Sequence, residues 1–269
     1  MPGNKVNLLL KYYTEVTRSK HLHFGFWEPG EELDMKNLRV AQDRYLRHLL
    51  SYIPAGVKTV LDAGCGVGGN AVELKNRGYD VVSLSPDPYQ EKVFRENTGG
   101  KVQFCLTGFE DFRAERRFDL VLMSESFQYM DLTAGLKKCR EVLNGRGWVL
   151  ISDFFKVDGV DDREVHISGH SLSGFLKELE AEGFKIARQE DVTDRTGPTL
   201  NFMISLFNDY AIPSIRMLAY AMETYIPFVY KISRRLFRSP IKKALEKSLV
   251  DDKTFAKCRR YMFYLLQLQ

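Results

Sequence analysis

The fold of this chain is decided by residues 60–69, which read VLDAGCGVGG. Apolar residues and one acid lead into a loop that contains four glycines. Glycine tolerates positive φ and lets a ligand approach the backbone closely, and a helix that starts after such a loop offers free N–H groups. The stretch therefore predicts a strand, a ligand-binding glycine loop and a helix, in that order.

Short apolar runs recur on both sides of this loop, with helix-like segments between most of them. The runs that we interpret as strands are 58–63, 80–84, 101–105, 118–124 and 147–153. The helix-like segments are 68–77, 88–97 and 133–143, and we expect the last to end in a left-handed cap at Asn144-Gly145. This alternation is typical of an α/β protein with a doubly wound parallel sheet.

The two ends of the chain follow other patterns. Residues 38–53 place apolar side chains on one stripe, which predicts an amphipathic helix before the sheet. A helix at 172–182 and a strand at 184–192 precede helical stretches over 199–257 and a strand-like run at 260–268. We therefore expect an N-terminal helical arm or lid (1–55), a Rossmann-like core (56–195), a helical cap insert (196–258) and the last strand of the core sheet (259–269).

Two classes of ligand fit the glycine loop. Gly64, Gly66 and Gly69 satisfy the GxGxxG spacing, so an NAD-binding oxidoreductase remains an alternative. However, Asp62 would repel a pyrophosphate and suits a ligand with an ammonium group. Position 83 is Ser83 rather than the acid that would hold a nicotinamide ribose. These positions favour an amino-acid nucleoside such as S-adenosylmethionine.

Four stretches together resemble one family. DAGCGVGG at 62–69 resembles motif I of the class I S-adenosylmethionine-dependent methyltransferases. HLHFGFWE at 21–28, SLSP at 83–86 and SESFQY at 124–129 resemble segments of the branch that contains the tocopherol, sterol and isoprenoid C-methyltransferases and the cyclopropane-type lipid enzymes. The resemblance implies a seven-stranded sheet and S-adenosyl-L-methionine as the cofactor.

The resemblance also implies which residues bind that cofactor. They are Asp62, Gly64, Gly66 and Gly68 at the methionyl end, Ser83 at the ribose, Phe109 and Glu110 at the adenine, and Ser124 and Trp27 beside them. Many family members carry an acid at position 83, and Gly108 stands where an acid often faces the adenine amine. We therefore expect the contacts to the ribose and the adenine to differ from the family pattern.

Three residues are candidates for catalysis. Glu125 follows a strand that should end at the ligand site, and methylation of an alkene carbon creates a cation that a base must deprotonate. Glu125 could instead only bond a backbone amide or a cofactor hydroxyl. Tyr129 could orient the substrate or simply pack, and His23 could be a base or a hydrogen-bonded packing residue. We expect no metal, since Asp153, His166 and His170 show no recognisable ligand spacing.

The cysteine content and the lengths of the apolar runs indicate in which compartment the protein works. The four cysteines, Cys65, Cys105, Cys139 and Cys258, are widely spaced, which favours a reducing, cytoplasmic compartment over a disulfide framework or a zinc ribbon. No apolar run is long enough to cross a membrane, so the sequence predicts a soluble or at most peripheral protein.

The C-terminal region, residues 198–269, is basic and rich in apolar residues. Residues 198–269 hold 12 Lys and Arg against 5 Asp and Glu, and five cations from Lys231 to Lys242 form one helical stripe. This pattern is typical of a solvated helix face, and a helix over 231–247 of this kind can also bind an anionic membrane or a diphosphate. We expect no nucleic-acid partner, since basic and aromatic residues do not interleave as in a base-stacking surface.

Together these patterns predict a methyltransferase for a small lipophilic or isoprenoid-like acceptor, with carbon favoured and oxygen or nitrogen open. The alternatives are a methyltransferase for a polar amine or phospholipid head group, the NAD-binding oxidoreductase, and a peripheral membrane scaffold with a vestigial pocket.

Overall fold

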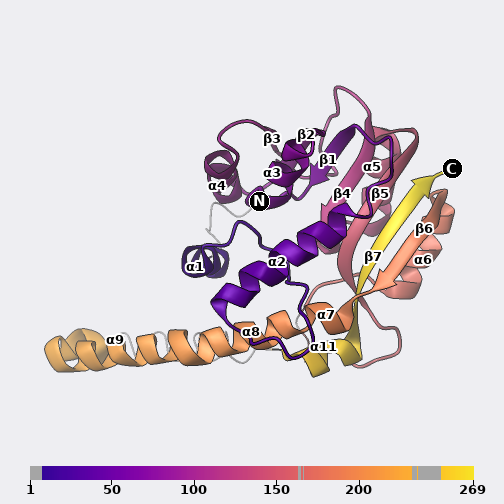
Figure 1. Cartoon of the computed structure of the whole chain (residues 1–269). Coiled ribbons are helices and arrows are strands. Elements are labelled where there is room, and N and C mark those ends of the chain that lie inside the picture. Colours follow the sequence, from indigo (N-terminus) through magenta and orange to yellow (C-terminus); the bar gives the residue numbers. More distant parts are fainter. Residues whose placement is uncertain (1–7, 163–164, 166, 232–234, 236–249) are drawn as a thin grey trace.

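The computed structural model describes residues 8–162, 165, 167–231, 235 and 250–269 (Figure 1). Its centre is one seven-stranded sheet in the order β3-β2-β1-β4-β5-β7-β6. The strands are β1 (Thr59–Ala63), β2 (Asp80–Ser85), β3 (Gln103–Leu106), β4 (Phe118–Ser124), β5 (Leu143–Lys156), β6 (Phe184–Asp191) and β7 (Arg259–Leu268). Strands β1 to β5 pair in parallel, whereas β7 runs antiparallel between β5 and β6. The expected α/β class with a seven-stranded sheet is confirmed.

Helices flank the sheet and precede or follow its strands. The α-helices are α1 (Leu8–Thr17), α2 (Met35–Leu50), α3 (Gly69–Asn76), α4 (Pro88–Thr98), α5 (Leu132–Val142), α6 (Leu172–Ala181), α7 (Thr193–Thr196), α8 (Pro198–Leu206), α9 (Ile212–Tyr225) and α11 (Asp252–Cys258). Two further segments are a 3₁₀ turn, η1 (Phe127–Tyr129), and a π-helical segment, η2 (Phe207–Ala211). Several helices start at a side chain that accepts a backbone N–H, such as Asp87 before α4 and Ser171 before α6.

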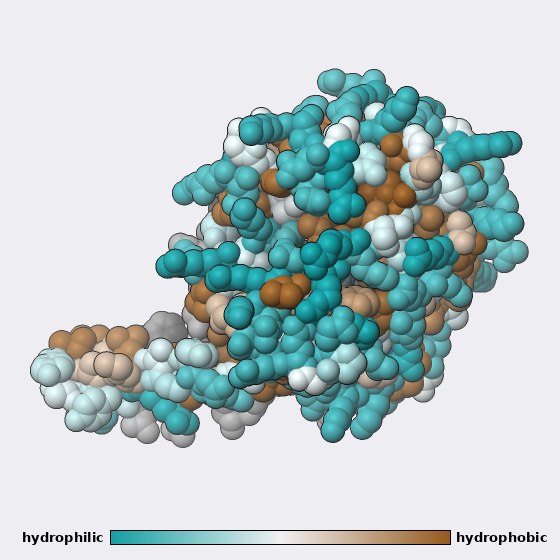
Figure 2. All heavy atoms as spheres, viewed as in Figure 1, coloured by the Kyte–Doolittle hydropathy of each residue, from teal (hydrophilic) through white to brown (hydrophobic). Residues whose placement is uncertain are grey.

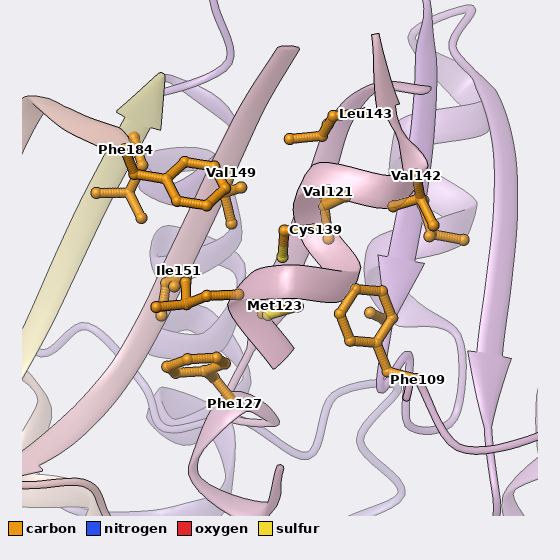
Figure 3. Packing of buried hydrophobic residues seen from close by; sticks show 14 of the residues in the cluster. Phe109, Val121, Met123, Phe127, Cys139, Val142, Leu143, Val149, Ile151 and Phe184 are labelled. Carbon is orange, nitrogen blue, oxygen red and sulfur yellow. The ribbon is translucent and has the colours of Figure 1, made fainter. Parts of the chain in front are cut away.

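Two large apolar clusters hold the helices on the sheet. One includes Val121 and Ile151 from the strands together with Phe127 and Cys139 (Figure 3). The other packs the buried stripe of α2 against strands β1, β4, β5 and β7. Because residues of the central strands are buried on both faces, these strands are nearly continuous apolar runs, as parallel strands usually are.

The expected left-handed cap at Asn144-Gly145 is wrong. Helix α5 ends at Val142, and its cap residue Leu143 is already extended. Leu143 pairs with Phe118, and the ladder then shifts register before Leu120 pairs with Trp148. Strand β5 therefore begins ten residues before Asp153, because pairing with β4 outweighs the turn preference of an Asn-Gly pair.

The region 196–258 is helical where it is described, as expected. Its described residues do not line the cavity at the ends of strands β1, β2 and β4. Helix α8 packs Phe202 and Leu206 against Trp27 and helix α2. Most of the basic stretch 231–247 lies outside the described residues. None of the described helices is long and apolar enough to cross a membrane.

Candidate active site

A cavity of about 520 Å³ lies where strands β1, β2 and β4 end. Its lining consists of Lys20, His21, Leu22, His23, Gly64, Cys65, Gly66, Val67, Gly69, Asn70, Leu84, Ser85, Pro86, Asp87, Gln90, Gly108, Phe109, Glu110, Ser124, Glu125, Ser126, Tyr129 and Met130. Open parallel sheets bind ligands at the carboxyl ends of their strands, and a cavity of this size suits a small molecule.

The glycine loop forms the floor of this cavity. Gly64 has φ of 83°, and a Cβ there would lie 2.3 Å from that of Ser126. Its N–H and that of Cys65 both donate to the carbonyl of Leu84, which ties the loop to the end of β2. Gly68, by contrast, packs against Phe94 and does not line the cavity. The two glycines therefore have different roles, one at the ligand site and one beneath it.

The N-terminal segment Lys20–His23 crosses the glycine loop and closes one side of the cavity. A Cβ at Gly69 would meet the carbonyl oxygen of Lys20 at 2.3 Å and Nδ1 of His21 at 2.4 Å. A Cβ at Gly66 would meet Leu22 at 3.2 Å. The loop and the segment above it thus fit together only because glycines leave this space.

We expect Gly69→Ala to displace this N-terminal segment, because the backbone of Lys20 has no room for the added methyl group. The cost in unfolding free energy should be about 1–3 kcal/mol. Trypsin should cleave after Lys20 faster, and S-adenosylhomocysteine should bind about tenfold or more weakly. Gly145→Ala is the matched control, since nothing lies within 4 Å of its Cβ position and its φ is ordinary. Equal behaviour of the two variants would contradict the packing role of Gly69.

Glu125 lies at the end of β4 in a left-handed conformation, with φ of 53°. Its Oε1 accepts the N–H of Phe24 at 2.6 Å and the hydroxyl of Tyr261 at 2.8 Å. Its own N–H donates to the carbonyl of Ser152 at 2.8 Å. Because these contacts hold the backbone and one carboxyl oxygen, the side chain is fixed where it lines the cavity. Burial raises the pKa of Glu125 to about 8, although the two donors oppose the shift.

A chain of buried hydroxyls stands behind Glu125, and the sequence patterns did not reveal it. The Tyr45 hydroxyl lies 2.7 Å from that of Tyr261, 2.6 Å from that of Ser152 and 3.1 Å from that of Ser124. Tyr45 comes from α2 and Tyr261 from β7, which are far apart in the sequence. Helical periodicity identified Tyr45 only as a core residue, and nothing local distinguishes either tyrosine from packing residues.

The other catalytic candidates differ in position. His23 stacks on Tyr45, with ring centroids 4.1 Å apart, and its Nδ1 lies 2.8 Å from the carbonyl of Phe24. Burial lowers its pKa well below the usual value, so the ring is neutral. This geometry favours the packing interpretation of His23. Tyr129 is largely exposed at the rim of the cavity, close to Met130.

Asp62 and Ser83 lie beneath the cavity and do not line it. They are directly paired across β1 and β2, and both side chains are buried. Asp62 Oδ2 and Ser83 Oγ each lack a hydrogen-bond partner among the described residues. Burial raises the pKa of Asp62 to about 7. An unpartnered carboxylate is costly to bury, so a cationic ligand group at the adjacent loop would supply what Asp62 lacks.

The structure places Trp27 away from the site, against the expectation that it binds cofactor. Its indole N–H donates to Thr199 at 2.9 Å, and its ring packs on Phe202. Helix α8 therefore uses Trp27 as a packing anchor. The remaining expected cofactor residues, Phe109, Glu110 and Ser124, do line the cavity.

Polar residues near the end of β2 were missed. Ser85 donates to the side-chain oxygen of Gln90 at 2.6 Å, and both line the cavity together with Asp87 and Asn70. Ser85 is part of the SLSP stretch at 83–86. Because a helix begins at Pro88, the sequence did indicate that the first turn of this helix would lie near the glycine loop.

Among the described residues, no group of three His, Cys, Asp or Glu side chains could hold a metal ion. Asp153 lies inside β5 rather than in a loop, and it accepts the N–H groups of Gln128 and Phe154. His170 lies 3.0 Å from the carbonyl of Phe127. His166 lies outside the described residues. Asp153 therefore holds the η1 turn in place, and burial raises its pKa to about 7.

Known proteins resemble this chain both in sequence and in fold. Residues 61–151 match the family model described as a methyltransferase domain. The structure of a putative sarcosine dimethylglycine methyltransferase from Galdieria sulphuraria superposes with a TM-score of 0.70 at 18% identity, covering 96% of this chain and 97% of that one. A geranyl diphosphate C-methyltransferase from Streptomyces coelicolor gives 0.68 at 15% identity, over 99% and 94%. Residues 61–151 therefore match a methyltransferase domain, and the chain shares the fold of these two structures.

The sequence relatives include sterol and hydroquinone methyltransferases. A sterol 24-C-methyltransferase from Gibberella zeae is 28% identical, over 72% of this chain and 58% of that protein. A 2-methyl-6-phytyl-1,4-hydroquinone methyltransferase from Synechocystis is 25% identical, over 83% and 76%. The chain spans about half the length of several of these relatives. The resemblance recognised in the four sequence stretches is confirmed.

Proposed function

We propose that this protein transfers a methyl group from S-adenosyl-L-methionine to a small lipophilic, isoprenoid-like acceptor, with carbon as the favoured acceptor atom. The observation that carries this proposal is one cavity that joins the glycine loop to Glu125. Sterol and phytyl-hydroquinone methyltransferases among the relatives support the acceptor class.

The residues present fit this cofactor. The glycine loop and the start of α3 would hold its methionyl end, with Asp62 countering the ammonium group from below the loop. Ser85, Gln90 and Asp87 are positioned for the ribose better than Ser83, since they line the cavity. Phe109 and Glu110 would face the adenine. When bound, the cofactor supplies a methyl group on a sulfonium, and transfer needs only an acceptor held in line and protected from water.

Glu125 would remove the proton that a methylated carbon loses. Its Oε1 is held by two donors, and among the described residues no donor to Oε2 is found, which leaves one oxygen for the acceptor. The raised pKa of about 8 makes it a stronger base than an exposed glutamate. The Tyr261 hydroxyl keeps the carboxyl group in one orientation.

Calorimetric titration tests the cofactor. We expect S-adenosylhomocysteine to bind and NAD not to bind, because the buried Asp62 beneath the glycine loop would repel a pyrophosphate and suits an ammonium group. Acceptor assays with prenylated quinols and sterols then test the acceptor class, against ethanolamine and glycine derivatives as the polar alternative. Binding of NAD alone would refute the proposal. Turnover of only the polar amines would show that the acceptor is a polar amine and not an isoprenoid-like molecule.

The location and the membrane contact are also proposals. All four cysteines are free, which supports a reducing, cytoplasmic compartment. The basic residues of 231–247 support contact with an anionic membrane, although most of this stretch lies outside the described residues. A lipophilic acceptor would be concentrated in that membrane.

A further inference from the structure

Helices α8 and α9 form an arm that leaves the body of the protein (Figure 1). The π-helical segment η2 joins them without a break, so the arm runs from Pro198 to Tyr225. Helix α8 buries Phe202 and Leu206 on the body, whereas neither η2 nor α9 has a buried residue. The outer half of the arm therefore has no apolar core of its own.

The outer half is nevertheless apolar. Met217 is 77% exposed, Tyr225 82% and Phe228 76%. Other large apolar side chains of the arm and of the residues that follow it are also exposed, namely Tyr210, Ile215, Leu218, Tyr220, Ile226 and Val229. Figure 2 shows hydrophobic side chains along this arm, where it projects from a mostly hydrophilic body. Water-facing apolar surface of this extent indicates a site of interaction.

The exposed side chains point to several sides of the helix. Successive helical residues are rotated by about 100°, so Leu218, Met217 and Tyr220 span about 160° of the circumference of α9, and Ile215 widens this arc to about 220°. So wide an apolar arc suits a helix that sinks into the interfacial layer of a lipid bilayer, with the side that carries the exposed Arg216 and Glu223 facing water. Tyrosine is also favoured at that layer, because its ring is apolar and its hydroxyl stays wet.

The charge of the region fits the surface of an anionic bilayer. Residues 205–250 contain eight Lys and Arg against three Asp and Glu. Lys231 and Arg235 are exposed just beyond the apolar residues 226–229. Helix α9 has 14 residues and spans about 21 Å, which is too short to cross a bilayer. An apolar segment followed by cations is the pattern of a helix that lies in the interface.

We propose that α9 and residues 226–229 insert into the interfacial layer of an anionic lipid bilayer. The root of the arm is linked to the active site through residues 24–27: Thr199 of α8 accepts the N–H of Gly25 and the indole N–H of Trp27. The neighbouring Phe24 donates to Glu125. Insertion therefore holds the protein at the bilayer, where the lipophilic acceptor of the proposed function dissolves.

Vesicle co-sedimentation of the full chain without cofactor tests this proposal independently of methyl transfer. We expect binding to vesicles of phosphatidylcholine with phosphatidylglycerol, and weaker binding to phosphatidylcholine alone or at high salt. The triple variant Met217→Ser, Leu218→Ser, Tyr225→Ser should bind about tenfold or more weakly, since it removes apolar surface from the arm. Its melting temperature should stay unchanged, because these side chains support no core.

The matched control is Leu106→Ser with Val160→Ser, which removes exposed apolar side chains from the body of the protein. The control should bind vesicles as the wild type does. Equal binding by the triple variant would overturn the proposal. So would a wild-type chain that ignores vesicles and forms dimers in analytical ultracentrifugation that the triple variant loses, because the arm would then be an interface between copies of this chain.

Discussion

Asp62→Asn is expected to make the unliganded protein more stable at pH 8 and to weaken S-adenosylhomocysteine binding by about two orders of magnitude. Asp62 is buried, its Oδ2 has no partner among the described residues, and burial raises its pKa to about 7. At pH 8 the wild type must keep an uncompensated charge in the interior. The neutral amide removes that charge, and it also removes the group that counters a ligand's ammonium.

The pH dependence of this effect has a definite sign. The pKa of Asp62 is higher in the folded state than its ordinary value of 3.8, so the folded protein binds the extra proton between about pH 4 and pH 7. The free energy of unfolding therefore falls as pH rises through this window, by at most about 1.4 kcal/mol per pH unit for one group. We expect a gain on the order of 1–3 kcal/mol for Asp62→Asn at pH 8 and little gain at pH 4.

Chemical denaturation at pH 4 and pH 8, with calorimetric titration at pH 8, measures both effects. Asp119→Asn is the matched control, because the Asp119 carboxylate accepts the N–H groups of Lys58 and Thr59 and its pKa is lowered. That variant should lose stability at pH 8. A loss of stability at pH 8 in Asp62→Asn with unchanged ligand affinity would contradict the role given to Asp62.

Glu125→Gln is expected to reduce turnover by about 10²- to 10⁴-fold while ligand affinity stays within a few fold. Glutamine keeps an oxygen that can accept from Phe24 and Tyr261, so the geometry of the β4 end should survive. It cannot accept a proton from the methylated acceptor. Steady-state kcat and the S-adenosylhomocysteine affinity, measured on the same variant, separate a base from a cofactor ligand.

Glu110→Gln is the matched control for this experiment. Glu110 lines the same cavity, and its Oε1 accepts the N–H of Asp131. We expect its replacement to raise KM for the cofactor and leave kcat nearly unchanged. A parallel loss of affinity and turnover in Glu125→Gln would assign Glu125 to cofactor binding instead.

The pH profile adds a test of the tyrosine behind Glu125. The wild-type kcat should rise with pH through the pKa of Glu125, which is about 8 before ligands bind. The Tyr261 hydroxyl favours the carboxylate, so Tyr261→Phe should move this rise to higher pH and reduce kcat at neutral pH about tenfold. A profile that does not move would show that Tyr261 only packs.

Local patterns in the sequence determined the sheet and the loop. The strand, glycine loop and helix at 60–69 and the alternation after it need only neighbouring residues: apolar runs form buried strands, and glycines take positive φ. Motifs at 21–28, 83–86 and 124–129 then narrowed the class. The position of Glu125 followed from the same logic, since a residue after a parallel strand lies at the ligand-binding edge.

Tertiary structure alone decided which polar residues meet there. Tyr261 of β7 donates to Glu125, and Tyr45 of α2 bonds to Tyr261. Thr199 accepts from Trp27, and Lys20 lies against Gly69, so all these contacts join distant segments. Packing rather than sequence spacing sets such contacts. For this reason Trp27 packs against helix α8 instead of binding a ligand, and Ser83 lies beneath the cavity. For the same reason an apolar pattern could not tell a core helix from α9, because only the fold shows which apolar residues find no neighbours.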